Sequence, residues 1–451
     1  FKVVVTNGAG LSATSTATIG FTPTWTSPAA GATLATFSTT LSSTITPFAA
    51  TDGIGGNAVT YSVPAGNLPS GLTLNASTGA ITGQIAAVGT TSVTFRVTDT
   101  VSGAFAERTF SIVGAVILYA FSSHTFTSAG RENRHGPTIT NLQGSYGTTG
   151  STAWVGATSP AYLTVPYQGV QEWTVPQTGV YRITMAGARG GTSNTTNLGG
   201  NGRKLRFDVT LQSNEKLSLL IGQSTSDTVS SNGGGGGGTF IIKSDGTIIA
   251  AAGGGGGASV TNPSNGRQNA PARSSNGAGN KGEDGGGSGG GLGGVNGGGG
   301  HGGGGASITN ANANTSADGT DGLNDQYNPG GAGVFGDGGD SNYTGMGTWT
   351  GGEKIWPFSG SSATARGGVP LGGFGGGGGG SLGVNAAQFG GSGGGGYSGG
   401  GGGASGGSPG DAAGGAGGSF INSSISSSLI TIDTNSTHGT TQHGYVTVEI
   451  L

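Results

Sequence analysis

The segment GGGGGGTFIIKSDGTIIAAAGGGGG, residues 233–257, places two short apolar runs between two runs of pure glycine. The apolar runs 239–243 and 247–249 flank Ser-Asp-Gly, and an Asp-Gly pair in this position is a strong hairpin signal. The glycine runs have no side chains to bury and lose more backbone entropy on folding than other residues. They therefore become ordered only where neighbouring chain satisfies their backbone groups.

Glycine is concentrated around this segment. The chain has 105 glycines among its 451 residues, and most of them lie between residues 233 and 418. A polyproline II-type helix rises about 3.1 Å per residue, and its amide groups point outward without internal hydrogen bonds. Such glycine helices can pack side by side and bond to one another, with Cα–H···O contacts between them. We expect a polyglycine II bundle over residues 253–429, and its structural glycines to include Gly233, Gly238, Gly253, Gly257, Gly297, Gly375, Gly380, Gly393 and Gly399.

A flexible linker is the alternative interpretation, because glycine-rich tracts are commonly flexible. Two features favour a folded bundle. The runs have similar lengths, as helices that span one layer would have. Apolar residues also interrupt them, including Phe335, Phe374, Tyr397 and Phe420, and a solvated linker would avoid such residues.

Composition limits the classes of function. The formal net charge is -3, and only 8% of residues are charged. Lysine and arginine are few and scattered, so the positive footprint of a nucleic-acid-binding protein is missing. There is no cysteine, which fits a phage virion component or a bacterial surface protein better than an animal ectodomain. No apolar stretch of 18 residues predicts a membrane span.

An internal repeat organises the first part of the chain. Val3–Asn7 (VVVTN) recurs as Phe95–Asp99 (FRVTD), and a glycine-bearing turn and a second strand pattern follow each copy. The spacing is the size of an immunoglobulin-like unit. We therefore interpret residues 1–20 as the last two strands of a truncated Ig-like domain and residues 21–115 as a complete Ig-like β-sandwich that serves as a spacer.

Three segments of this unit, Tyr61–Val63, Leu68–Leu74 and Ser77–Gly83, resemble the immunoglobulin and cadherin-like modules of bacterial and phage surface proteins. Calcium-binding relatives carry clustered acidic residues at the module junctions. Only Asp52 and Asp99 stand out here, and neither belongs to a dense acidic motif. We interpret both as turn or strand-end residues and predict no metal site or cofactor, with a structural calcium ion as the alternative.

A second β region follows. Its strand patterns lie within residues 116–252, among them Val170–Pro176, and the chain ends on the strong strand pattern Gly444–Leu451. We expect residues 116–252 and 430–451 to form one β-sandwich with the glycine bundle as an insertion.

The second half resembles, in order, the glycine-rich extracellular domain of the anaplastic lymphoma kinase and leukocyte tyrosine kinase receptors. The segments that carry this resemblance are Thr125–Arg131, Gly169–Pro176, Leu217–Gln223, Gly372–Gly375 and His443–Val448. The resemblance implies a sandwich of tumour-necrosis-factor type with an inserted polyglycine II bundle. The receptors carry cysteines in this domain, which this chain lacks. A glycine-rich module after Ig-like repeats is also similar to tail-fibre proteins of marine phages, especially cyanophages.

Catalytic signals are weak, and we expect no enzyme. The five histidines (His124, His135, His301, His438 and His443) are separated in sequence from plausible acid or nucleophile partners. Gly390–Gly394 fits a nucleophile-elbow pattern, but a polyglycine tract gives that match by chance. Asp337 and Asp340 hint at calcium without the spacing of a calcium-binding β-roll.

Binding is expected on the loops that join the glycine helices, because these helices present little chemistry of their own. The stretch 336–368 combines aromatic residues with charged neighbours, a composition suited to sugar rings and to protein hot spots. The alternative is that the aromatic residues form a small core that caps the bundle. The candidate receptor-binding residues are Tyr343, Met346, Trp349, Glu353, Lys354, Trp356 and Phe358.

The sequence thus predicts an all-β protein of the virion surface or extracellular space. The leading interpretation is a phage tail-fibre or adhesin segment whose glycine-rich tip binds a host cell-surface glycan or protein. Its other expected partners are fibre subunits, including further copies of itself in a homo-oligomer such as a trimer. The alternatives are a structural subunit of an extracellular filament and a receptor ectodomain.

Overall fold

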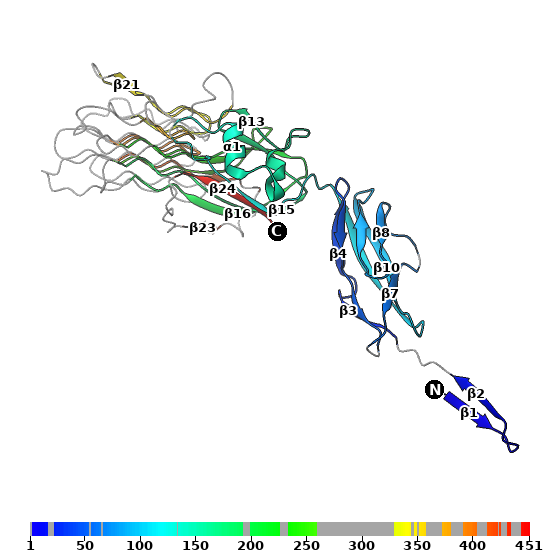
Figure 1. Cartoon of the computed structure of the whole chain (residues 1–451). Coiled ribbons are helices and arrows are strands. Elements are labelled where there is room, and N and C mark those ends of the chain that lie inside the picture. The colour runs from blue at the N-terminus through cyan, green and yellow to red at the C-terminus, as the bar shows by residue number, and fades with distance from the viewer. Residues whose placement is uncertain are drawn as a thin grey trace. The chain divides into compact units, whose positions relative to one another are not determined.

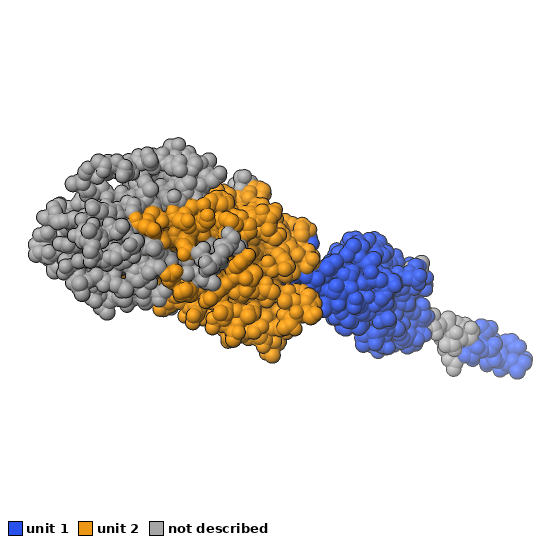
Figure 2. All heavy atoms as spheres, turned by 90° about the horizontal axis from the view of Figure 1, so that it is seen from above, with its two compact units in different colours: residues 1–120, 176–178 blue, residues 121–175, 179–451 orange. Residues whose placement is uncertain are grey.

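The computed structural model describes residues 2–16, 22–53, 56–64, 66–132, 134–192, 199–225, 233–258, 329–343, 347–349, 351–357, 372–379, 391–403, 413–422, 424, 431–433 and 443–451. The chain divides into two compact units (Figure 2), unit 1 with residues 1–120 and 176–178 and unit 2 with residues 121–175 and 179–451. Strands dominate both units, and the described helices are short. The predicted all-β class is confirmed.

Unit 1 contains four sheets, with strand orders β1-β2, β4-β11-β10-β7, β3-β6 and β5-β9-β8. Its strands are β1 (Lys2–Thr6), β2 (Ser12–Thr16), β3 (Thr24–Ser27), β4 (Thr33–Ser38), β5 (Ser43–Ile45), β6 (Ala49–Thr51), β7 (Val59–Ser62), β8 (Leu72–Leu74), β9 (Ile81–Gly83), β10 (Gly89–Asp99) and β11 (Phe105–Ala115).

The sequence repeat corresponds to a β-hairpin whose turn has the same structure in both copies. The hairpins β1–β2 and β10–β11 are both antiparallel, and Asn7 and Asp99 occupy corresponding places where the first strand of each hairpin ends. Oδ1 of each accepts two backbone N–H groups of its own turn. Gly10 and Gly103 have φ of 74° and 73°, a left-handed conformation that favours glycine.

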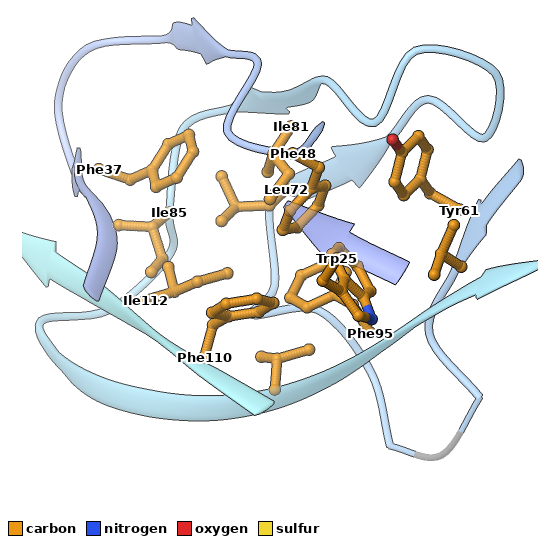
Figure 3. Packing of buried hydrophobic residues seen from close by; sticks show 12 residues of the cluster. Trp25, Phe37, Phe48, Tyr61, Leu72, Ile81, Ile85, Phe95, Phe110 and Ile112 are labelled. Carbon is orange, nitrogen blue, oxygen red and sulfur yellow. The ribbon is translucent and has the colours of Figure 1, made fainter. Parts of the chain in front are cut away.

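An aromatic core fills unit 1 (Figure 3). Alternation along the second half of β10 directs Val93, Phe95 and Val97 inward, as the period of a strand requires. The Phe95 ring lies 4.8 Å from Phe48 and 6.1 Å from Phe110, measured between centroids. These side chains are almost completely shielded from solvent, so hydrophobic burial stabilises this unit.

Unit 2 has a five-stranded sheet, β12-β24-β15-β16-β23, a six-stranded sheet, β13-β14-β17-β18-β19-β22, and the hairpin β20–β21 (Figure 1). Two short helices, α1 (Ile139–Tyr146) and the 3-10 helix η1 (Gly150–Val155), follow β12. The strands are β12 (Ser123–Phe126), β13 (Leu163–Tyr167), β14 (Val170–Thr174), β15 (Gly179–Ala186), β16 (Lys204–Leu211), β17 (Lys216–Leu220), β18 (Thr239–Lys243), β19 (Ile248–Ala252), β20 (Ser341–Tyr343), β21 (Gly347–Trp349), β22 (Phe420–Ile421), β23 (Thr431–Asp433) and β24 (Tyr445–Ile450).

The two larger sheets of unit 2 meet through aromatic side chains. Trp173 of the six-stranded sheet lies 5.7 Å from Phe126 and 6.1 Å from Tyr181 of the five-stranded sheet, between ring centroids. The C-terminal strand β24 pairs with β12 on one side and with β15 on the other. Strand β24 is therefore an interior strand whose two pairing partners come much earlier in the sequence.

Glycine-rich segments outside the sheets hydrogen-bond to one another. The Gly236 amide donates to Gly255, Gly254 to Gly395, and Gly395 back to Gly236, with N···O distances of 2.9, 2.7 and 3.0 Å. Gly417 donates to Gly254 at 2.9 Å. These bonds link four different segments in several directions, the arrangement that packed polyglycine II helices require.

Close backbone approach explains why glycine is needed there. A Cβ atom at Gly377 would lie closer than 3.0 Å to the carbonyl oxygen of Gly235, and most described bundle glycines face a similar backbone contact. The bundle also extends beyond the expected range of 253–429. Segments 187–192, 199–203, 221–225 and 233–238 contribute backbone bonds to it as well.

Seven of the nine predicted structural glycines are buried in this network. Gly297 and Gly380 lie outside the described residues. The buried ones are Gly233, Gly238, Gly253, Gly257, Gly375, Gly393 and Gly399.

Candidate functional site: an aromatic surface on the glycine bundle

The predicted binding residues fall into three groups. Tyr343 belongs to β20 and Trp349 to β21, and these strands form an antiparallel hairpin in which Tyr343 is opposite Gly347. Met346 and Phe358 lie outside the described residues. The remaining three, Glu353, Lys354 and Trp356, lie on one short segment that packs on the bundle.

Two aspartates hold this segment in place. Asp337 Oδ1 accepts the Lys354 amide at 2.7 Å, and Asp340 Oδ1 accepts the Gly351 amide at 2.8 Å. Both carboxylates that hinted at calcium thus bond to backbone. Across the described part of the chain, no group of three or more His, Cys, Asp or Glu side chains is placed to hold a metal ion.

Trp356 is anchored by its backbone and by its ring. Its amide donates to Val334 at 2.8 Å, and the Val334 amide donates to Tyr397 at 3.1 Å. The indole lies against the β18–β19 turn, since a Cβ added at Gly246 would be 3.1 Å from Nε1. Neighbouring Ile355 is completely buried. The interpretation of the aromatic residues as a small capping core therefore holds in part for Trp356, which is half-buried beside Ile355.

Three half-buried aromatic residues pack against one hydrophobic cluster of unit 2, and we call Trp356, Tyr397 and Phe420 the aromatic surface. The rings of Tyr397 and Phe420 are stacked, with centroids 4.3 Å apart and planes at 14°. All three pack against one hydrophobic cluster: Val170, Leu220, Phe240, Ile242, Ile248, Ala251, Val334, Ile355 and Phe374. Their inner edges are fixed, and their outer edges contact solvent.

Polar groups accompany these rings in the chain. Lys354 is exposed and Glu353 half-buried, and both precede Trp356 by no more than three residues. Asn422 follows Phe420 by two residues, and its Nδ2 donates to the Ile248 carbonyl at 3.1 Å. Partly exposed rings with charged and amide neighbours suit the CH faces of sugars or the anchors of a protein interface.

Sequence reasoning did not assign Tyr397 and Phe420 to binding. It noted both only as apolar residues that interrupt the glycine runs. Phe420 reaches the site because β22 pairs with β19, a contact between residues far apart in the sequence. The sequence feature that could have identified Tyr397 and Phe420 as binding candidates is a large aromatic ring in glycine-rich surroundings.

The expectation that the histidines lack a nucleophile partner is wrong for His443. Its Nδ1 lies 3.2 Å from both the Oγ and the backbone nitrogen of Ser224. The ends of β17 and β24 bring the two residues together, where the Gly444 amide donates to Gly222. The Ser224 side chain is buried, and burial also lowers the pKa of His443. Nδ1 thus accepts the Ser224 backbone amide, which suits a structural role.

Comparison with known proteins covers parts of the chain. Residues 22–114 match the family model described as "Putative Ig domain". This part of the chain is an Ig-like domain. The prediction of an Ig-like sandwich here is confirmed, and the aromatic core described above is its interior.

A second match is to the leukocyte tyrosine kinase receptor of Mus musculus, at 35% identity over 103 residues. The aligned part is 23% of this chain and 11% of the receptor, so the chain spans about a ninth of that relative's length. No helix among the residues described is long and apolar enough to cross a membrane.

Proposed function

We propose that this chain is a non-enzymatic recognition protein, a phage tail-fibre or adhesin segment whose glycine bundle presents a host-binding surface. The observation that carries the proposal is the aromatic surface of Trp356, Tyr397 and Phe420. Its rings are seated on a hydrophobic cluster, and their outer parts remain accessible.

Rigid presentation is the physical advantage of the glycine bundle. Backbone bonds among Val334, Tyr397 and Trp356 fix the chain beneath the rings. A preorganised surface loses little conformational entropy on binding, so more of the contact energy appears as affinity. The Ig-like unit serves as a spacer, and several copies on one particle raise avidity without new contacts.

The match to a tyrosine kinase receptor offers a ligand-binding ectodomain as another interpretation. The absence of cysteine from the chain favours a virion or bacterial surface protein over an animal ectodomain. Both interpretations place the protein outside the cell and assign it a binding role.

Binding of the fluorescently labelled full chain to a panel of intact bacterial cells tests the proposal. Tyr397→Ser removes one ring of the stack and should weaken saturable binding at least tenfold. Tyr167→Ser is the matched control, since Tyr167 is 39% exposed and lies on β13, the edge strand of the six-stranded sheet opposite to β22, which carries Phe420.

Hydrogen exchange over residues 391–403 verifies that the Tyr397→Ser bundle remains folded. Equal binding by both variants would reject the aromatic surface as the site. Absence of binding by the folded wild-type chain to every cell type would instead favour a structural subunit of a filament.

A further inference from the structure

A groove of about 630 Å³ lies on the outer face of the four-stranded sheet of unit 1. Its floor is a ladder of hydroxyl side chains across β10 and β11, where Ser92 is opposite Ser111 and Thr94 opposite Thr109. Ala30 and Gly31 line it from the loop before β4. The volume is within the range of small-ligand sites.

The wall of the groove is tied to the sheet. Arg108 Nη1 donates to the Pro28 carbonyl at 2.8 Å. The Gly31 amide donates to the Thr109 carbonyl, and the Ser111 amide to the Ala32 carbonyl, both at 3.0 Å. Three bonds therefore hold the loop, so the groove exists before any ligand arrives.

The groove offers polar atoms with unused hydrogen-bonding capacity. Thr94 and Thr109 bond to each other through their hydroxyls at 2.9 Å. Ser92 and Ser111 make no side-chain hydrogen bond within the described part of the chain. Arg96 donates twice to Oε1 of Glu107, at 2.9 and 2.6 Å, which leaves Oε2 as an acceptor.

We propose that this groove binds a short neutral oligosaccharide. A sugar hydroxyl can donate to Glu107 Oε2 while others exchange hydrogen bonds with Ser92 and Ser111, each of which both donates and accepts. An apolar ligand fits poorly, because the polar floor offers it little. This site is separate from the aromatic surface and does not depend on its function.

The test applies the full chain to a printed array of neutral oligosaccharides, followed by calorimetric titration of the strongest binder. The double variant Ser92→Ala/Ser111→Ala and the single variant Glu107→Gln should each weaken binding at least tenfold. Ser92→Tyr, which fills the groove from an exposed strand position, should abolish it. Thr98→Ala, on β10 but outside the groove lining, is the matched control and should bind as the wild type does.

Tyr397→Ser separates this proposal from the aromatic surface, because it should leave oligosaccharide binding unchanged. The proposal is overturned if the array shows no neutral oligosaccharide bound. It is equally overturned if the groove variants, with unchanged thermal unfolding, bind as tightly as the wild type does.

Discussion

The Ig-like unit and the glycine bundle offset the loss of chain entropy on folding in opposite ways, the first through side chains and the second through the backbone. In unit 1, aromatic rings such as Phe48, Phe95 and Phe110 are buried against one another, and burial of apolar area offsets the loss of chain entropy. In the bundle, backbone amides and carbonyls satisfy one another across several directions, and side chains are nearly absent. The stability of unit 1 should therefore fall when side-chain atoms are removed, and the stability of the bundle should fall when side-chain atoms are added.

Removal of a core ring should have the largest effect. Phe95 is fully buried, so Phe95→Ala leaves a cavity and should lower the free energy of unfolding of unit 1 by about 3–5 kcal/mol. Segment-resolved hydrogen exchange measures the loss in unit 1 alone. Phe105→Ala is the control, because Phe105 lies on the paired strand and is 49% exposed. Equal losses in both variants would refute a core held by this ring.

Addition of one methyl group should damage the bundle almost as much. In Gly377→Ala the new Cβ collides with the Gly235 carbonyl, and displacement of packed backbone should cost about 3 kcal/mol. Faster amide exchange in segments 233–238 and 372–379 reports the damage. Gly144→Ala is the matched control, because nothing lies within 4 Å of its Cβ position in α1.

The control variant should move in the opposite direction. Alanine in a helix interior is more stable than glycine by about 0.5–1 kcal/mol, so Gly144→Ala should leave stability unchanged or raise it. If Gly377→Ala proved as mild as Gly144→Ala, the tight backbone packing of the bundle would be contradicted.

A histidine half-buried among aromatic rings gives unit 2 a pH dependence. Burial lowers the pKa of His124 to about 4, and the rings of Phe126, Tyr146 and Trp154 lie 4.6–5.0 Å from it. The unfolded chain, with a histidine pKa of about 6.5, binds this proton more readily. Stability should therefore fall as the pH decreases from about 6.5 to 4, by about 2 kcal/mol.

Replacement of His124 tests whether this residue causes the loss of stability at low pH. His124→Phe removes one titrating group from the aromatic cluster and should make the dependence between pH 6.5 and 4 shallower in urea titrations. Part of the slope should remain, because burial also lowers the pKa of His443. A slope in the variant as steep as that of the wild type would assign the proton uptake to groups other than His124.

Sequence reasoning located the features that depend on local chemistry. The Asp-Gly hairpin of residues 239–249 and the repeated turn at Asn7 and Asp99 follow from neighbours in the chain. It could not place contacts set by topology. The stack of Tyr397 on Phe420 and the approach of His443 to Ser224 both depend on strand pairings between residues distant in sequence.

The bundle's extent was underestimated for a related reason. Segments 187–192 and 199–203 contain fewer consecutive glycines than the later runs, yet their backbones are hydrogen-bonded into the same network. A glycine needs its small size only where another backbone approaches. Glycine composition identifies these closely packed positions where glycines form long runs, and it misses them where single glycines occur.

The smallest predicted effect concerns a feature that the two units share. Thr94 and Thr109 in unit 1, and Thr125 and Thr447 in unit 2, form cross-strand hydroxyl pairs at 2.9 Å on exposed sheet faces. Thr94→Val and Thr125→Val keep the branched shape and remove one hydroxyl, so each should cost less than about 1 kcal/mol. Parallel urea titrations with segment-resolved exchange compare the two losses. A loss of several kcal/mol in unit 2 alone would mean that its five-stranded sheet depends on the hydroxyl pair of Thr125 and Thr447. The β-sheets of the two units would then differ in how they are stabilised, as unit 1 and the glycine bundle do.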